Sequence, residues 1–214
     1  MMFSLRLRRA LNASLPGHVV YMPRWNEKRT GPWLGPKGQP VALLLHHTAG
    51  AKTTSTDPKN PGNVKGANAG VINYIQNHFP VPAANFTLDR DGTVYVHSAF
   101  PIWHAGLGDF IGKQPWNLLG VPRNLGNRYM LGVEIVSKGT KKDFTAAQID
   151  SLVRLQEACG RASGWPAEKR RATIRHPRHK DWTTRKIDIR YSQDDVNGWM
   201  HGVTERTAGT SPDQ

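Results

Sequence analysis

Two apolar runs, VALLLHH at 41–47 and MLGVEIV at 130–136, constrain the fold more than any other feature of the chain. Runs of this length and composition are typical of buried strands. Each run also carries ionisable side chains: His46 and His47 end the first, and Glu134 lies inside the second. Polar groups at the mouth of a buried strand are where α/β proteins place their chemistry, so these residues are the first candidates for a functional site.

The remaining segments alternate between helical and extended patterns. NFTLDRDGTVYV has alternating apolar residues on both sides of Asp91-Gly92, which predicts a β-hairpin with an Asp-Gly turn. Thr145 and Gln148 form a capping box ahead of a helix expected over 145–160. The other predicted elements are a helix at 68–79 with Ile72, Ile75 and Phe79 on one face, a short strand at 171–176, and a last helix at 193–203 anchored by Trp199. Strands that alternate with helices predict an α/β domain with a central mixed β-sheet flanked by helices.

Breaker residues divide the chain into three parts. Residues 1–40 are rich in Arg, Pro, Gly and Trp, so we expect a basic arm without regular structure that lies on the domain through Trp25 and Trp33. Residues 41–205 are expected to form a single domain, and residues 206–214 a flexible tail.

The net charge of the chain indicates the kind of molecule that it is expected to bind. The chain has 29 Lys and Arg against 16 Asp and Glu, a formal charge of +13, which favours a polyanion such as nucleic acid, an anionic membrane or an anionic cell wall. The single cysteine, Cys159, excludes an intrachain disulfide. The N-terminal residues are basic without the apolar core of a signal peptide, and no stretch has the length of a membrane span. We therefore expect a soluble protein that is made without a secretion signal.

A second group of chemistry-bearing residues lies in RHPRHKDWTTRKID, at 175–188. A His and an Asp on such a loop, with a distant His on a strand, make a three-ligand set of the kind that holds catalytic zinc and leaves one position for water. A nearby glutamate would accept a proton from that water, and a nearby lysine would stabilise an oxyanion. Both His176 and His179 are candidates for the histidine of this loop.

Five motifs, in the same order, resemble those of the type 2 N-acetylmuramoyl-L-alanine amidases over about residues 40–200. They are LLLHHTAG, NFTLDRDGTVYV, WHAG, NRYMLGVEIVSKG and HKDWTTRKID. That superfamily also includes T7-type phage lysozyme and the peptidoglycan recognition proteins. The HKDWTTRKID run is most similar to bacteriophage endolysins of actinobacterial hosts. The resemblance implies a zinc cleft at one edge of the sheet.

The resemblance also implies a ligand set. Zn²⁺ is the implied cofactor, and the residues that match the family's ligands are His46, His179 and Asp188. His179 is preferred to His176 because its spacing to Lys186 and Asp188 matches the closing motif.

Catalytic and substrate roles follow in the same way. Glu134 and Lys186 match catalytic residues of the family, and we expect His104, His47 and Trp103 at the substrate face.

The chain departs from the family's pattern at two positions. Ala84 stands where T7-like members carry a tyrosine, so the role of the base must rest on Glu134. Ile189 follows Asp188 in place of the usual proline, so the loop after the third ligand is expected to differ.

The implied activity is zinc-dependent hydrolysis of the amide bond between N-acetylmuramic acid and L-alanine in bacterial peptidoglycan. We expect a monomeric phage endolysin that is made in the host cytoplasm and reaches the cell wall after holin-mediated release. The anionic wall is the expected partner, rather than a specific nucleic acid, because the basic residues are dispersed and no reader motif is recognisable. The alternative is a non-catalytic peptidoglycan-binding module.

Overall fold

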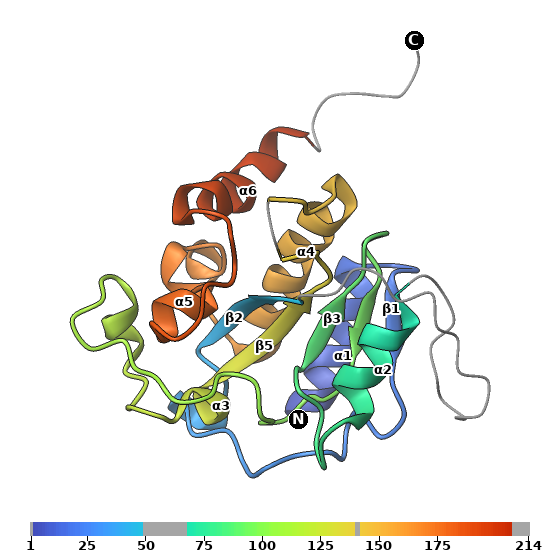
Figure 1. The fold of residues 1–214 in the computed structure, drawn as a ribbon, viewed down its shortest axis with the longest axis horizontal. Coiled ribbons are helices and arrows are strands. Elements are labelled where there is room, and N and C mark those ends of the chain that lie inside the picture. The colour runs from blue at the N-terminus through green and yellow to red at the C-terminus, as the bar shows by residue number, and fades with distance from the viewer. Residues whose placement is uncertain (1, 49–67, 140–141, 207–214) are drawn as a thin grey trace.

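A five-stranded mixed sheet lies at the centre of the molecule, as predicted (Figure 1). The computed structural model describes residues 2–48, 68–139 and 142–206. The strands are β1 (Val19–Tyr21), β2 (Ala42–His47), β3 (Phe86–Leu88), β4 (Val94–Val96) and β5 (Met130–Ile135), and their order in the sheet is β1-β4-β3-β5-β2. The β3–β4 pair is antiparallel, whereas β1–β4, β3–β5 and β5–β2 are parallel.

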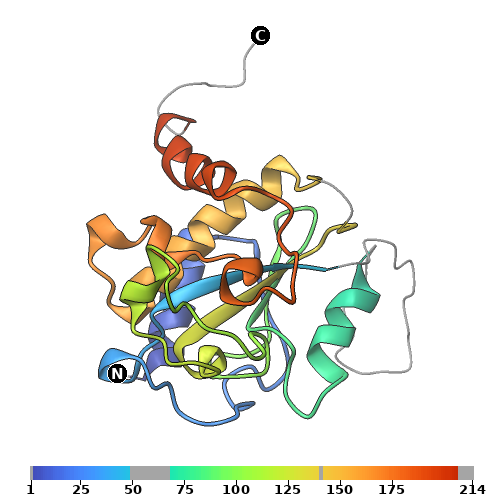
Figure 2. The same ribbon diagram turned by 60° about the vertical axis from the view of Figure 1, so that its left-hand side comes forward.

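Helices flank this sheet (Figure 2). They are α1 (Phe3–Ser14), α2 (Ala69–Asn77), α3 (Gly126–Tyr129), α4 (Ala146–Ser163), α5 (His179–Trp182) and α6 (Gln193–Arg206). Short 3₁₀ turns lie at Pro36–Gly38, Trp116–Leu119, Ala167–Lys169 and Thr173–Arg175. No described helix is both long and apolar enough to cross a membrane.

One face of the sheet packs against α1 and α4. Leu45, Val133 and Phe86 are fully buried there, in one cluster with Leu11 of α1 and Leu155 of α4. Because side chains alternate along a strand, the neighbouring residues of β2 and β5 point to the other face. The main apolar core therefore lies on one side of the sheet, whereas Leu44 and Met130 on the opposite face belong to a second apolar cluster with Trp182.

The N-terminal segment is not the irregular arm that its composition predicted. Leu7 and Leu11 of α1 are fully buried in the main core, and β1 adds a strand to the sheet edge beside β4. The expected anchors do pack on the domain: Trp33 is buried and Trp25 is half-buried against the core. The arginines of α1 obscured its apolar stripe, which recurs every four residues from Phe3.

The opposite face of the sheet is partly covered by α2. Ile72 of α2 packs with Tyr95 of β4 and with Met22, and all three are buried. The predicted helix at 68–79 is thus confirmed in type, but Phe79 lies beyond its last turn and is exposed. On the same face, the carboxyl-terminal parts of β5 and β2 carry Glu134 and His46 of the candidate site.

Local signals predicted several elements correctly. The hairpin turns at Gly92, whose φ of 87° favours glycine, and the Thr145–Gln148 capping box begins α4. The last predicted helix is α6, and Trp199 packs against the core from it. Most of the predicted tail at 206–214 lies outside the described residues.

The predicted strand at 171–176 is wrong. The segment winds through a 3₁₀ turn, and the side chain of Gln156 holds it by donating to the carbonyls of Arg170 and Arg175. The chain reaches the edge of β2 slightly later, where Arg178 forms a single parallel bridge with Leu45. Side-chain hydrogen bonds to the backbone thus replace the ladder that the apolar pattern predicted.

Candidate metal centre

Neighbouring parallel strands place His46 and Glu134 side by side. His46 lies near the carboxyl end of β2, directly opposite Glu134 of β5 in the strand register. On the other side of β5, Thr87 of β3 is opposite the same glutamate. The side chains of these three residues project from the face of the sheet opposite the main core, so both ionisable groups point into the same space.

The short helix α5 brings His179 to the edge of β2. The Leu45 amide donates to the carbonyl of Pro177 at 2.9 Å, which fixes the start of the turn. Arg178 and Asp181 then brace it through a two-pronged ion pair, with contacts of 2.6 and 2.8 Å. Asp181 of the HKDW motif is therefore structural, and it orients the helix that carries His179.

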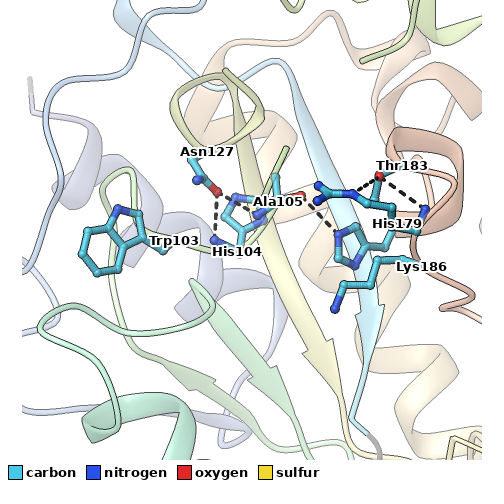
Figure 3. A pocket seen from close by; sticks show the side chains of 9 residues that line it. Trp103, His104, Ala105, Asn127, His179, Thr183 and Lys186 are labelled. Atoms are coloured by element: carbon cyan, nitrogen blue, oxygen red, sulfur yellow. Dashed lines mark hydrogen bonds between the residues drawn. The ribbon is translucent and has the colours of Figure 1, made fainter. Parts of the chain in front are cut away.

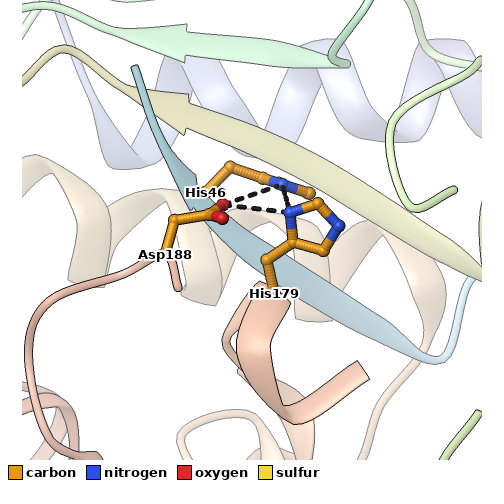
Figure 4. Close-up of side chains that lie close together, drawn as sticks. All are labelled: His46, His179 and Asp188. Carbon is orange, nitrogen blue, oxygen red and sulfur yellow. Dashed lines mark hydrogen bonds and ion pairs between the residues drawn. The ribbon is translucent and has the colours of Figure 1, made fainter. Parts of the chain in front are cut away.

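Three side chains converge where β2, α5 and the following segment meet (Figure 4). His46 Nδ1 lies 2.9 Å from His179 Nδ1, and the Oδ2 atom of Asp188 lies 3.0 Å from His179 Nδ1 and 3.5 Å from His46 Nδ1. All three residues are buried, and their possible ligand atoms fall within 4.8 Å of one another. Among the described residues this group could hold a metal ion.

The hydrogen bonds on the far side of each ring decide which nitrogen faces the site. His179 Nε2 lies 3.2 Å from the carbonyl of Ala105, which can only accept, so this nitrogen carries the proton. His104 Nε2 likewise donates to the carbonyl of Met130 at 2.8 Å. The Nδ1 atom of neutral His104 then accepts from His46 Nε2 at 3.3 Å. In the neutral rings, Nδ1 of both His46 and His179 is therefore a lone-pair donor to a cation.

Burial sets the charge of these groups. Desolvation lowers the pKa of His46 to about 4, assisted by the neighbouring His179, so the His46 ring is neutral near pH 7. Burial raises the pKa of Asp188, but a hydrogen bond from a protonated ring nitrogen of His179 or His46 outweighs it and holds that pKa well below its usual range. The neutral His46 ring, the His179 ring and the Asp188 carboxylate thus face a common point.

Glu134 is held in a different state from Asp188. Desolvation, followed by the charge of Asp188, raises the pKa of Glu134 to about 8, while Lys186 opposes the shift. Its Oε2 atom is buried and has no hydrogen-bond partner among the described residues. A buried carboxyl group of this kind is poised to exchange a proton near neutral pH.

A cavity of about 370 Å³ opens beside His179 (Figure 3). Its lining includes the aromatic rings of Trp103 and His104 and the cationic side chains of Arg185 and Lys186. The Trp103 side chain is half-exposed, and the positive charge of Lys186 acts on both Glu134 and His46. The cavity combines an aromatic surface with cationic groups next to the converging ligands.

A family model described as N-acetylmuramoyl-L-alanine amidase matches residues 36–190. The chain belongs to this amidase family. Membership supports a peptidoglycan amidase activity, and the matched region includes every residue of the converging group. No curated protein matches the sequence significantly.

Solved structures share the amidase fold at low sequence identity. A selenomethionine derivative of AmpD is 18% identical with a TM-score of 0.52, and the match covers 87% of this chain and 96% of that one. A mutant endolysin from Bacillus subtilis is 18% identical with a TM-score of 0.52, covering 85% and 97%. Bumblebee PGRP-SA is 15% identical with a TM-score of 0.51, covering 85% and 95%.

Two histidines of the chain lie away from the converging group. His47 follows His46 on β2 and so points to the opposite face, where its ring lies against Gly139 and its Nδ1 atom is 3.0 Å from the carbonyl of Thr48. His176, the competing candidate for a ligand, is fully buried with its Nε2 atom 3.1 Å from Asn197 Oδ1. The structure thus joins His179, and not His176, to His46 and Asp188.

Sequence reasoning missed the backbone acceptors of this site. The carbonyls of Ala105 and Met130 fix which ring nitrogens point inward, yet no side-chain pattern marks a carbonyl group. His104 is also tied more closely than predicted, because both of its ring nitrogens have partners within the protein. In the sequence, the WHAG motif was the one signal that pointed to these backbone acceptors and to His104.

Proposed function

We propose that the protein hydrolyses the amide bond between N-acetylmuramic acid and L-alanine, with Zn²⁺ held by His46, His179 and Asp188. The observation that carries this proposal is the convergence of two Nδ1 lone pairs and a carboxylate beside Glu134, whose Oε2 atom is buried. Without a cation, neutral His46 and His179 would set two acceptor nitrogens 2.9 Å apart. Two imidazoles and one carboxylate are a donor set that suits catalytic zinc and leaves a position open.

Zinc in such a site would supply Lewis acidity that makes water nucleophilic near neutral pH. Glu134 takes the proton of the attacking water on its carboxylate and passes it to the leaving amine of L-alanine. The pKa of Glu134, about 8 without a metal, would fall toward the working pH if a cation were held by His46, His179 and Asp188, so that Glu134 could both accept and return the proton. Lys186 stabilises the negative charge that develops on the carbonyl oxygen.

The cavity beside His179 takes the substrate. The half-exposed Trp103 ring offers a flat surface for a sugar or peptide group, and His104 forms the wall next to the ligands. His47 supports the end of β2 from the opposite face. Trp103 and Lys186, which both line this cavity, orient the scissile amide over the ligand group.

The biological role we propose is that of a phage endolysin, which is made in the host cytoplasm and acts on the wall after holin-mediated release. The likeness in fold to an endolysin from Bacillus subtilis supports this role, together with the formal charge of +13 that suits an anionic wall. The enzyme acts as a monomer.

The deciding experiment is hydrolysis of purified peptidoglycan with and without a chelator. The wild type should release new N-terminal L-alanine, lose this activity with chelator, and regain it when zinc is added. Glu134→Gln keeps the shape of the side chain but cannot accept the proton, so its rate should fall by about 100-fold or more. Glu27→Gln, which changes an exposed acid, serves as the control and should retain full activity.

Each alternative outcome has a clear meaning. New reducing sugar ends in place of L-alanine amines would identify a glycosidase and overturn the proposal. Binding to the wall without either product would identify the non-catalytic binding module.

A further inference from the structure

One short segment, His104-Ala105, receives the far nitrogens of both histidine ligands. His46 Nε2 donates to the His104 ring at 3.3 Å, and His179 Nε2 donates to the Ala105 carbonyl at 3.2 Å. The two ligands come from elements that are 133 residues apart in sequence. The position of this segment therefore sets the orientation of both rings together.

Asn127 clamps this segment from α3. Its Oδ1 atom accepts from the backbone amide of His104 at 2.8 Å and from that of Ala105 at 2.7 Å (Figure 3). A single side-chain oxygen thus holds two consecutive amides. These two short bonds fix the orientation of the peptide between His104 and Ala105. They therefore also orient the adjoining carbonyl of Ala105, which accepts from His179.

The beginning of β5 completes the clamp. The carbonyl of Met130, three residues after Asn127, accepts from His104 Nε2 at 2.8 Å. Gly132 gives the ring its space, because a Cβ atom built there would lie 2.4 Å from His104 Nδ1. The ring of His104 is therefore fixed by the same stretch of chain that fixes its backbone.

We propose that Asn127 is a positioning residue for the metal centre: it holds residues 104–105 so that His46 and His179 both present Nδ1 to the metal. The inference rests on the proposed zinc site. Asn127 lines the cavity edge but acts through the two histidines. Partners of this kind typically change metal affinity by about 10- to 100-fold.

The test compares zinc affinity and ring tautomers in three variants. Asn127→Ala removes the acceptor, and zinc binding, measured by competition with a chelator, should weaken by about 10-fold or more. Asn127→Asp keeps an acceptor oxygen and should bind zinc nearly as tightly as the wild type. The matched control is Asn124→Gly, which removes a similar bond of 3.1 Å to Gly108 in the same loop and should leave zinc affinity unchanged.

Tautomers are read by ¹⁵N NMR of the metal-free protein at about pH 8, where neutral rings dominate. His104 should be the Nε2–H tautomer in the wild type, because the Met130 carbonyl accepts from Nε2, and a mixture of tautomers in Asn127→Ala. Equal zinc affinity in Asn127→Ala and wild type, or failure of Asn127→Asp to restore it, would overturn the role of Asn127. Wild type that binds no zinc would instead overturn the proposed zinc enzyme, and the NMR result would still decide the tautomer inference.

Discussion

At the scale of single residues, His97 shows what burial does to an ionisable group outside the metal centre. Its ring is fully buried on the face under α2, with Nδ1 2.7 Å from Gln76 Oε1 and Nε2 2.8 Å from Thr87 Oγ1. Gln76 donates its own amide to the carbonyl of Pro23, so its oxygen accepts from His97. The neutral ring is thus fully satisfied, and desolvation, with the charge of Lys28, lowers its pKa to about 3.

This pKa predicts a stability that falls in acid. Between about pH 6.5 and pH 3 the unfolded chain binds a proton at His97 that the folded protein does not, so stability is lost as the pH falls through this range. At pH 4, protonation of His97 in the unfolded chain lowers the free energy of unfolding by roughly 3 kcal/mol. Urea unfolding at pH 7 and pH 4, with chelator present, should show a smaller loss for His97→Gln than for wild type. Exposed His78→Gln is the control, and an equal loss in all three proteins would contradict the prediction.

At the scale of elements, α1 is part of the core rather than an addition to it. Leu7 and Leu11 of α1 are fully buried in the main apolar cluster, and α1 packs along α4. Leu11→Ala should therefore lower the free energy of unfolding by about 3 kcal/mol, because it leaves a cavity. Leu5→Ala makes the same chemical change on the exposed side of α1, where the side chain is 50% exposed, and should cost much less. Similar losses in urea unfolding would show that α1 is not anchored through this face.

The elements also show how far the sequence alone can lead. The buried strands, the hairpin at Gly92 and the capped helix α4 rest on local patterns, and each was predicted. The N-terminal helix was not predicted, because arginines interrupt its apolar residues in the sequence. These apolar residues form one continuous face only in the folded helix, where they pack against α4. In the site, spacing pointed to His179 and Asp188, but the tautomers depend on carbonyls that meet the rings only in the folded chain.

At the scale of the whole molecule, the excess of 13 positive charges predicts attraction to an anionic wall. Raising the ionic strength from about 0.1 M to about 1 M shortens the Debye length from about 10 Å to about 3 Å, so binding to purified walls and their lysis should both weaken several-fold. Cleavage of a small, soluble muramoyl peptide needs no long-range attraction and should change little. Wall binding and lysis that are unchanged by salt would contradict the electrostatic role. An equal loss with the soluble substrate would place the effect at the active site, where Lys186 acts on Glu134.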